Sequence, residues 1–152
     1  MRAYLSGAIE HATDRGSSWR NEISKWLKNR LGHEVFNPVT AEPLSNKERE
    51  NFRSWRITDY PKFKQTVRKL IDHDLHNLIN EIDYIICYWD KSVLKGAGTH
   101  GEVTTAYYHK IPVYTVLGMA KSEVSSWILG CTTQEFDDFD DLKIFLLQKY
   151  GK

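Results

Sequence analysis

The chain has 152 residues, enough for one domain with its own hydrophobic core and too few for two independent ones. Its 21 lysine and arginine residues nearly balance 20 aspartate and glutamate residues, so no global charge argues for nucleic acid or an anionic membrane as a partner. The start of the chain lacks the apolar run of a signal peptide, and no segment has the length of a membrane span. We therefore expect a cytoplasmic protein, and its two cysteines suggest no disulfide framework.

Predicted strands and helices alternate along the chain. Short apolar strands are expected at 2–6, 33–38, 83–89, 111–117 and 131–136, and the third is apolar on both faces, as buried parallel strands are. Apolar residues at helical spacing predict helices at 17–31, 63–82, 99–110, 121–129 and 140–150, with Ser17 or Ser18 capping the first and Gly32 ending it. This alternation predicts an α/β fold, a doubly wound sheet of about five mainly parallel strands with helices on both faces.

The stretch from 40 to 62 interrupts this alternation. It is polar, contains Pro43 and Pro61, and includes one candidate short helix at 46–56. Such a long insertion in a compact domain is more often functional, as a lid or a substrate wall, than not. In sheets of this kind ligands bind at the carboxyl ends of the strands, and the insertion follows one of those ends.

The segment KGAGTHGEVTTAYYHKIPVYTV, residues 95–116, raises the question of what Glu102 does. Gly96, Gly98 and Gly101 precede it, and the glutamate is expected in the first turn of a helix. Complementing the helix dipole, worth roughly 0.3–1 kcal/mol, is one explanation. The other is catalytic: glycines let a ligand approach the backbone, and a carboxylate at this edge can attack an anomeric carbon. That chemistry requires no metal and no cofactor.

Three segments together carry a resemblance to a known family: YLSGAIE at 4–10, DL at 74–75 followed by DYII at 83–86, and GTHGEVTTAYYHKIPVY at 98–114. They resemble the nucleoside 2-deoxyribosyltransferase family and the related 2′-deoxynucleoside 5′-monophosphate N-glycosidases. The resemblance implies a flavodoxin-like sheet, Glu102 as the nucleophile and a ping-pong reaction at C1′. It also implies a nucleoside or nucleotide and a free nucleobase as ligands, and a homo-oligomer whose subunits complete one another's sites.

The resemblance also assigns roles to other residues. Tyr4 is expected to position the nucleophile, with an inward-facing strand aromatic as the alternative. Asp74 is expected to contact the base and assist proton transfer, and Asp72 competes for this role, whereas Asp83 is expected to be structural. The predicted substrate-binding residues are Gly7, Ala8, Ile9, Asp14, Arg56, Gly96, Gly98 and Thr99. Capping of the first helix is an equal alternative for Asp14.

Gly96 departs from the pattern of the family. At this position the transferases tend to have Asp and the monophosphate hydrolases Ser. Glycine matches neither, so this residue does not distinguish between the two activities here. The backbone N–H groups of GAGT and the Thr99 hydroxyl are candidates for holding the 5′ group. Other candidates from the first two loops are Arg15, Arg20, Arg53 and Arg56.

Other motifs were weighed against this interpretation. No Gly-x-Gly-x-x-Gly follows the first strand and no Gly-Lys-Ser/Thr occurs, so dinucleotide and nucleoside-triphosphate chemistry lack support. His73 and His76 have metal-ligand spacing without a third ligand, and we expect no metal. Trp55 and Trp89 fit base stacking and core packing equally well. We therefore favour a deoxyribosyltransferase, then a monophosphate N-glycosidase, with a non-catalytic nucleotide-binding module as the rival.

Overall fold

The computed structural model describes residues 1–151, and its centre is a five-stranded parallel sheet. The strands are β1 (Arg2–Gly7), β2 (Glu34–Phe36), β3 (Tyr84–Trp89), β4 (Val113–Leu117) and β5 (Gln134–Phe136). Their order is β2-β1-β3-β4-β5, and every pairing is parallel. This is the flavodoxin-like order. The second strand is added on one side of β1 and the later strands on the other, so the strand order reverses between β1 and β3. The predicted strands and fold class are confirmed.

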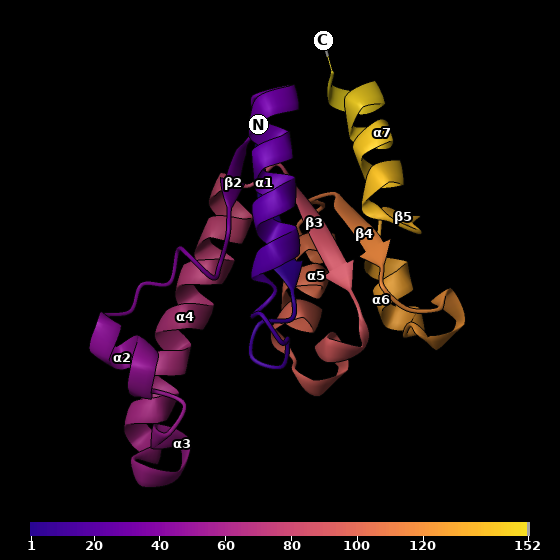
Figure 1. Ribbon diagram of the computed structural model, residues 1–152. Coiled ribbons are helices and arrows are strands. Elements are labelled where there is room, and N and C mark those ends of the chain that lie inside the picture. Colours follow the sequence, from indigo (N-terminus) through magenta and orange to yellow (C-terminus); the bar gives the residue numbers. More distant parts are fainter. Residues whose placement is uncertain (152) are drawn as a thin grey trace.

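Helices cover both faces of the sheet (Figure 1). On one face lie α1 (Ser17–Leu31) and α7 (Phe139–Tyr150), and on the other α4 (Tyr60–Glu81), α5 (Gly98–Tyr108) and α6 (Ser126–Cys131). Alternate residues of a strand face opposite sides, so Leu5 of β1 packs toward α1 while Tyr4 packs toward α4 and α5. Cys87 is fully buried in β3, as a strand-interior residue should be.

The insertion forms two short helices instead of the single one predicted. These are α2 (Asn46–Asn51), which Ser45 and Glu48 start with a reciprocal capping box, and α3 (Trp55–Thr58). Helix α4 begins at Tyr60, three residues earlier than predicted, because Pro61 sits in the first turn, where its missing N–H is not needed. The first half of α4 projects beyond the sheet, and α2 and α3 lie against this projecting part (Figure 1).

The start of α1 depends on residues that precede the predicted serine caps. Helix α1 is preceded by Arg15 and Gly16, both with positive φ, and the Asp14 carboxylate accepts hydrogen bonds from the N–H groups of Gly16 and Ser18. Asp14 therefore caps this helix, which confirms the capping alternative given for it, and the predicted caps Ser17 and Ser18 are wrong. Gly32 ends the helix as expected.

The predicted helix at 121–129 is also interrupted. It divides into a 3₁₀ turn, η2 (Lys121–Glu123), and α6, because Val124 and Ser125 have extended backbones. A second 3₁₀ turn, η1 (Lys91–Lys95), follows β3.

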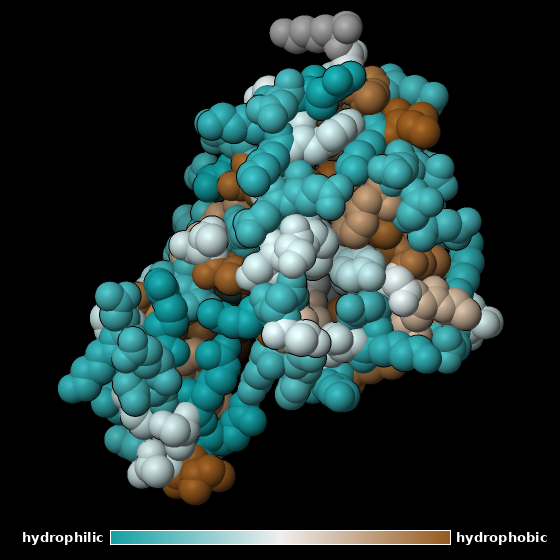
Figure 2. Space-filling model, in the orientation of Figure 1, coloured by the Kyte–Doolittle hydropathy of each residue, from teal (hydrophilic) through white to brown (hydrophobic). Residues whose placement is uncertain are grey.

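Hydrophilic side chains cover most of the face seen in Figure 2. Among residues 1–151, no helix combines the length and the apolar character needed to cross a membrane.

Candidate active site

A cavity of about 280 Å³ lies at the carboxyl ends of β1 and β3. Its walls come from the β1–α1 loop, the insertion, α4 and the start of α5. The structure brings most of the predicted site residues to this cavity: Gly7, Ala8, Ile9, Arg56, Asp74, Gly96, Gly98, Thr99 and Glu102. Tyr4 lies beneath the cavity, fully buried, and Asp14 lies outside it on the surface.

Two hydroxyl groups hold the carboxylate of Glu102. The Tyr4 hydroxyl donates to Oε1 over 2.9 Å, and the Ser6 hydroxyl donates to Oε2. Both donors are fully buried and lie on the same face of β1, two residues apart. Helix α5 begins at Gly98, so Glu102 lies in its second turn. The prediction that Glu102 lies in the first turn of this helix is therefore wrong. The carboxylate faces β1 and does not complement the helix dipole.

The environment of Glu102 favours its neutral form. Burial raises the pKa of this carboxyl to about 7, while the hydrogen bonds from Ser6 and Tyr4 oppose the rise by stabilising the anion. The charge of Asp74 raises the pKa further, and the guanidinium of Arg20 lowers it. A carboxyl that titrates near neutral pH is typical of functional sites.

Asp74, and not its competitor Asp72, reaches the cavity. Its side chain is 21% exposed, whereas Asp72 is exposed on the surface. Burial raises the pKa of Asp74 to about 7, and the nearby charge of Glu42 adds to the rise. Asp74 can therefore carry a proton at neutral pH. Residues 1–151 contain no group of three or more side chains arranged to hold a metal ion.

The four arginines considered for the 5′ group divide into two pairs. Arg20 is fully buried and donates only to backbone carbonyls, and Arg15 pairs with Glu42 over 2.8 Å. Arg53 and Arg56 line the cavity. Arg56 also pairs with Glu10 over 3.2 Å, which joins the insertion to the β1–α1 loop.

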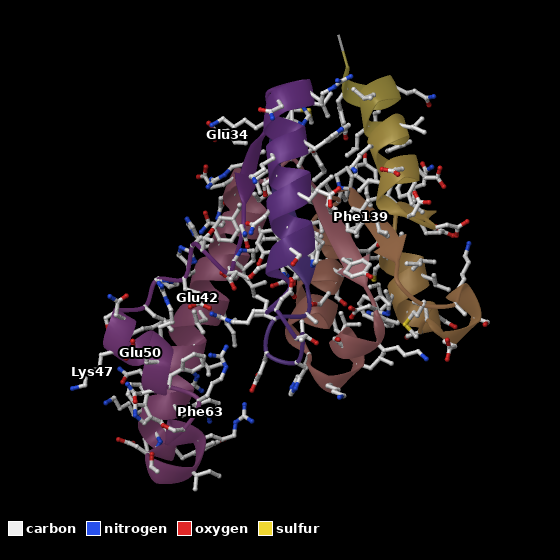
Figure 3. All side chains as sticks on the ribbon, in the orientation of Figure 1. Glu34, Glu42, Lys47, Glu50, Phe63 and Phe139 are labelled. Carbon is white, nitrogen blue, oxygen red and sulfur yellow. The ribbon has the colours of Figure 1, made fainter. Side chains whose placement is uncertain are left out.

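Glu42 is a buried carboxylate of the insertion that the sequence analysis missed. It lines the cavity with only 7% of its side chain exposed. Arg15 holds it over 2.8 Å and Arg49 over 3.1 Å, so two cations compensate its charge. Figure 3 labels Glu42 beside the part of α4 that projects from the sheet, where it ties the insertion to the β1–α1 loop.

One face of α4 supplies an apolar wall. Phe63, Val67, Leu70 and Asp74 line the cavity and recur every three or four residues, so they share one face of the helix. Phe52 stacks on Phe63 with ring centroids 6.5 Å apart. The two tryptophans considered for stacking do not line the cavity: Trp89 is buried against His100, and Trp55 packs under Lys62.

The comparisons with known proteins give structural matches only. No family model and no curated protein matches the chain. A 2-deoxyribosyltransferase from the psychrotolerant bacterium Bacillus psychrosaccharolyticus superposes with a TM-score of 0.67 and 15% identity, over 94% of this chain and 90% of that one. A 2-desoxiribosyltransferase from Leishmania mexicana gives 0.62 and 14%, over 97% of each chain.

A third match is a conserved protein from Enterococcus faecalis V583, with a TM-score of 0.68 and 11% identity over 98% of each chain. At these identities the likeness shows a shared fold. The chain thus has the fold of 2-deoxyribosyltransferases, in agreement with the resemblance seen in the sequence.

Proposed function

We propose that the protein is a nucleoside 2-deoxyribosyltransferase-like enzyme, which cleaves the N-glycosidic bond of 2′-deoxynucleosides and transfers the sugar to another base. The main support is Glu102, whose carboxylate is held by Tyr4 and Ser6 beside a cavity at the carboxyl edge of the sheet. The fold, shared with 2-deoxyribosyltransferases from Bacillus and Leishmania, adds to this support. The reaction needs no cofactor.

The reaction runs in two displacements at C1′. An oxygen of ionised Glu102 forms a bond to C1′ while the C1′–N bond breaks, and its electron pair leaves with the base, which takes a proton from Asp74. A nitrogen of the incoming base then attacks C1′, and the Glu102 carboxylate departs. Asp74, now ionised, takes the proton of the incoming base. Two inversions give net retention at C1′.

The two pKa values suit these roles. Both Glu102 and Asp74 have a pKa of about 7, so each is present in both protonation states at neutral pH. The productive combination is an ionised Glu102 and a protonated Asp74. The repulsion between the two negative charges disfavours joint ionisation, and this raises the share of singly ionised pairs.

The charges of the cavity do not by themselves select between nucleosides and monophosphates. Four carboxylates line it, from Glu10, Glu42, Asp74 and Glu102, against the guanidinium groups of Arg53 and Arg56. Arg15 and Arg49 compensate the charge of Glu42, Arg56 pairs with Glu10, and Asp74 is neutral in the productive state. The charges around the cavity therefore nearly cancel and neither repel nor strongly attract a phosphate dianion. The alternative, a 2′-deoxynucleoside 5′-monophosphate N-glycosidase, is favoured by the N-terminus of α5, which borders the cavity without a side-chain cap.

A chromatographic time course separates these activities. Purified protein is incubated with each 2′-deoxynucleoside and each 5′-monophosphate, with and without a second free base. A new nucleoside formed only with the acceptor base identifies transfer, whereas free base released without an acceptor identifies hydrolysis. Glu102→Ala should abolish either activity. Ligand binding that survives this substitution, with no turnover by the wild type, would instead identify the non-catalytic binding module.

Two further expectations from the sequence belong to this proposal. A homo-oligomer is implied by the resemblance, and the large exposed side chains of Tyr107, Tyr108 and Trp127 on α5 and α6 offer apolar surface for contacts between subunits. Light scattering of the purified protein tests this expectation. A cytoplasmic location stays a prediction and is tested by fractionation of the source cells.

A further inference from the structure

Arg20 is a buried cation that the proposed reaction does not use. Its side chain has no exposed surface, and among the described residues it forms no ion pair with a carboxylate. Its guanidinium donates instead to five backbone carbonyls at distances from 2.8 to 3.3 Å, those of Leu5, Gly7, Ala8, Arg15 and Gly16. Burying an arginine in this way is costly, and the cost shows in its pKa, which burial lowers to about 10.

Two of these carbonyls flank Ser6 in the chain. Arg20 Nε donates to Leu5 over 3.3 Å, and Arg20 Nη2 donates to Gly7 over 2.8 Å. Between them, the Ser6 hydroxyl donates to Glu102 Oε2. Arg20 belongs to α1 and Glu102 to α5, and these helices cover opposite faces of the sheet. A continuous set of contacts thus crosses the sheet through the end of β1.

We propose that Ser6 and Arg20 are positioning residues for Glu102: Arg20 fixes the carbonyl groups of Leu5 and Gly7, the two residues that flank Ser6, and the Ser6 hydroxyl holds Oε2 of the carboxylate. The proposal rests on the nucleophilic role of Glu102. Tyr4 holds Oε1, so the second donor stops the carboxylate from rotating and keeps it aimed at the cavity. Such orientation of a nucleophile reduces the entropy lost on reaching the transition state.

The Ser6 hydroxyl also acts on the charge of Glu102. A donor stabilises the anion, so its loss is expected to raise the pKa of this carboxyl. The other ionisable groups around Glu102 are Tyr4 on β1, Cys87 on β3, Asp74 on α4 and Arg20 on α1. Burial raises the pKa values of Tyr4 and Cys87, which stay neutral, so only Asp74 and Arg20 contribute full charges.

The first test measures the titration of Glu102 directly and needs no turnover. The side-chain carboxyl carbon of ¹³C-labelled glutamate is followed by NMR from pH 4 to 9, and the Glu102 signal is assigned by its loss in Glu102→Gln. Ser6→Ala should move the midpoint to higher pH. Thr115→Ala, the matched control, removes a buried hydroxyl of β4 that bonds to Thr132 and should leave the midpoint in place. An unchanged midpoint in Ser6→Ala would refute the proposal, whether or not the protein is an enzyme.

The second test is a double-mutant cycle between Ser6→Ala and Arg20→Lys. Lysine keeps the charge but has three donors in place of five, so it cannot hold all five carbonyls. If Arg20 acts through Ser6, Arg20→Lys should lower kcat/KM at least tenfold in the wild type and less than threefold in the Ser6→Ala background. Equal losses in both backgrounds would overturn the link between the two residues.

The proposal can still be tested if the wild type is inactive or if the Arg20→Lys variant does not fold. If the wild type has no activity, the cycle is read in the NMR midpoint of Glu102, so failure of the proposed function and failure of this inference are distinguishable. If circular dichroism shows that Arg20→Lys does not fold, the Ser6→Thr variant tests the proposal instead. It retains a hydroxyl, and it should restore the midpoint and the kcat/KM lost in Ser6→Ala. No recovery in a folded Ser6→Thr variant would count against the role of the hydroxyl.

Discussion

Tyr4 and Glu102 are 98 positions apart in the chain, yet the Tyr4 hydroxyl donates a 2.9 Å hydrogen bond to Glu102 Oε1. The bond joins the first strand to the second turn of α5. Helix α5 packs directly on β1 and β3, which are adjacent in the sheet although a long insertion separates them in sequence. The doubly wound topology therefore determines where Glu102, the proposed nucleophile, lies, at the edge where such sheets bind ligands.

Removal of the Tyr4 hydroxyl tests this contact. We expect Tyr4→Phe to lower kcat/KM by roughly tenfold or more at neutral pH, because a hydrogen bond to a charged group is worth about 1.5–3 kcal/mol. The acid limb of the pH profile should also move to higher pH, since the anion loses a donor. The stacking of this ring on Phe36, at 5.1 Å, is retained, so the melting temperature should change little.

Tyr114→Phe is the matched control for this substitution. It removes a hydroxyl that bonds to Tyr150 on the opposite face of the sheet. It should leave the pH profile in place. A Tyr4→Phe variant with the kinetics of the wild type would show that the contact does not serve catalysis.

Asp74 is expected to act as the proton donor. Its pKa of about 7 keeps a large protonated fraction at neutral pH, and this fraction falls as the pH rises. Asp74→Asn should therefore lower kcat by about 10²–10⁴-fold and remove the alkaline limb of the pH profile. The exposed neighbour Asp72 provides the control, because Asp72→Asn changes the same charge outside the cavity. Equal effects of the two substitutions would exclude Asp74 as the acid.

The features of the fold and the site that depend on local sequence patterns can be predicted from the sequence. The five strands follow from short apolar runs, and the placement of Gly96, Gly98 and Thr99 at the cavity follows from the glycine-rich segment that precedes Glu102. The sequence pattern predicts the start of α4 three residues too late because Pro61 is typical of loops, although the first turn of a helix accepts proline.

The supporting residues were not predictable because their contacts join distant elements. Glu42 meets Arg15 across 27 positions, and Ser6 meets Glu102 across 96. Neither contact leaves a periodic signal in the chain. For Ser6 a weaker signal existed, since its position two residues after Tyr4 puts both hydroxyls on one face of the strand. A buried arginine such as Arg20 has no such signal, because most arginines are exposed.

Gly7 at the end of β1 and Gly96 at the end of η1 both line the cavity, and they should respond differently to an added methyl group. At Gly7 a Cβ would lie 2.9 Å from the Trp19 ring and 3.2 Å from the Tyr88 carbonyl oxygen, so Gly7→Ala should destabilise the protein by about 1–3 kcal/mol. At Gly96 the nearest atom is His11 Cδ2 at 3.7 Å and φ is −128°. Gly96→Ala should therefore stay within about 0.5 kcal/mol of the wild type. Chemical denaturation checks both values, and a neutral Gly7→Ala would contradict the tight packing at this strand end.

Ionisation of the half-buried Glu102 should reduce the stability of the fold. Its pKa is about 7 in the folded state against 4.5 for an ordinary glutamate, so between these values the folded protein holds a proton that the unfolded chain has released. Stability must then fall as the pH rises across this window, by an amount on the order of 3 kcal/mol once Glu102 is fully ionised.

Glu102→Gln removes this ionisation and provides the test. Below about pH 4.5 the Glu102 carboxyl of the wild type is protonated in both the folded and the unfolded state. The variant and the wild type should therefore differ least there. The variant should become progressively more stable than the wild type up to about pH 8, where denaturant unfolding should give the largest difference. Glu34→Gln removes an exposed carboxylate of β2 and should follow the wild type throughout. A difference between Glu102→Gln and the wild type that does not change with pH would mean that Glu102 titrates normally, and the proposed balance of its burial against the Tyr4 and Ser6 hydrogen bonds would be wrong.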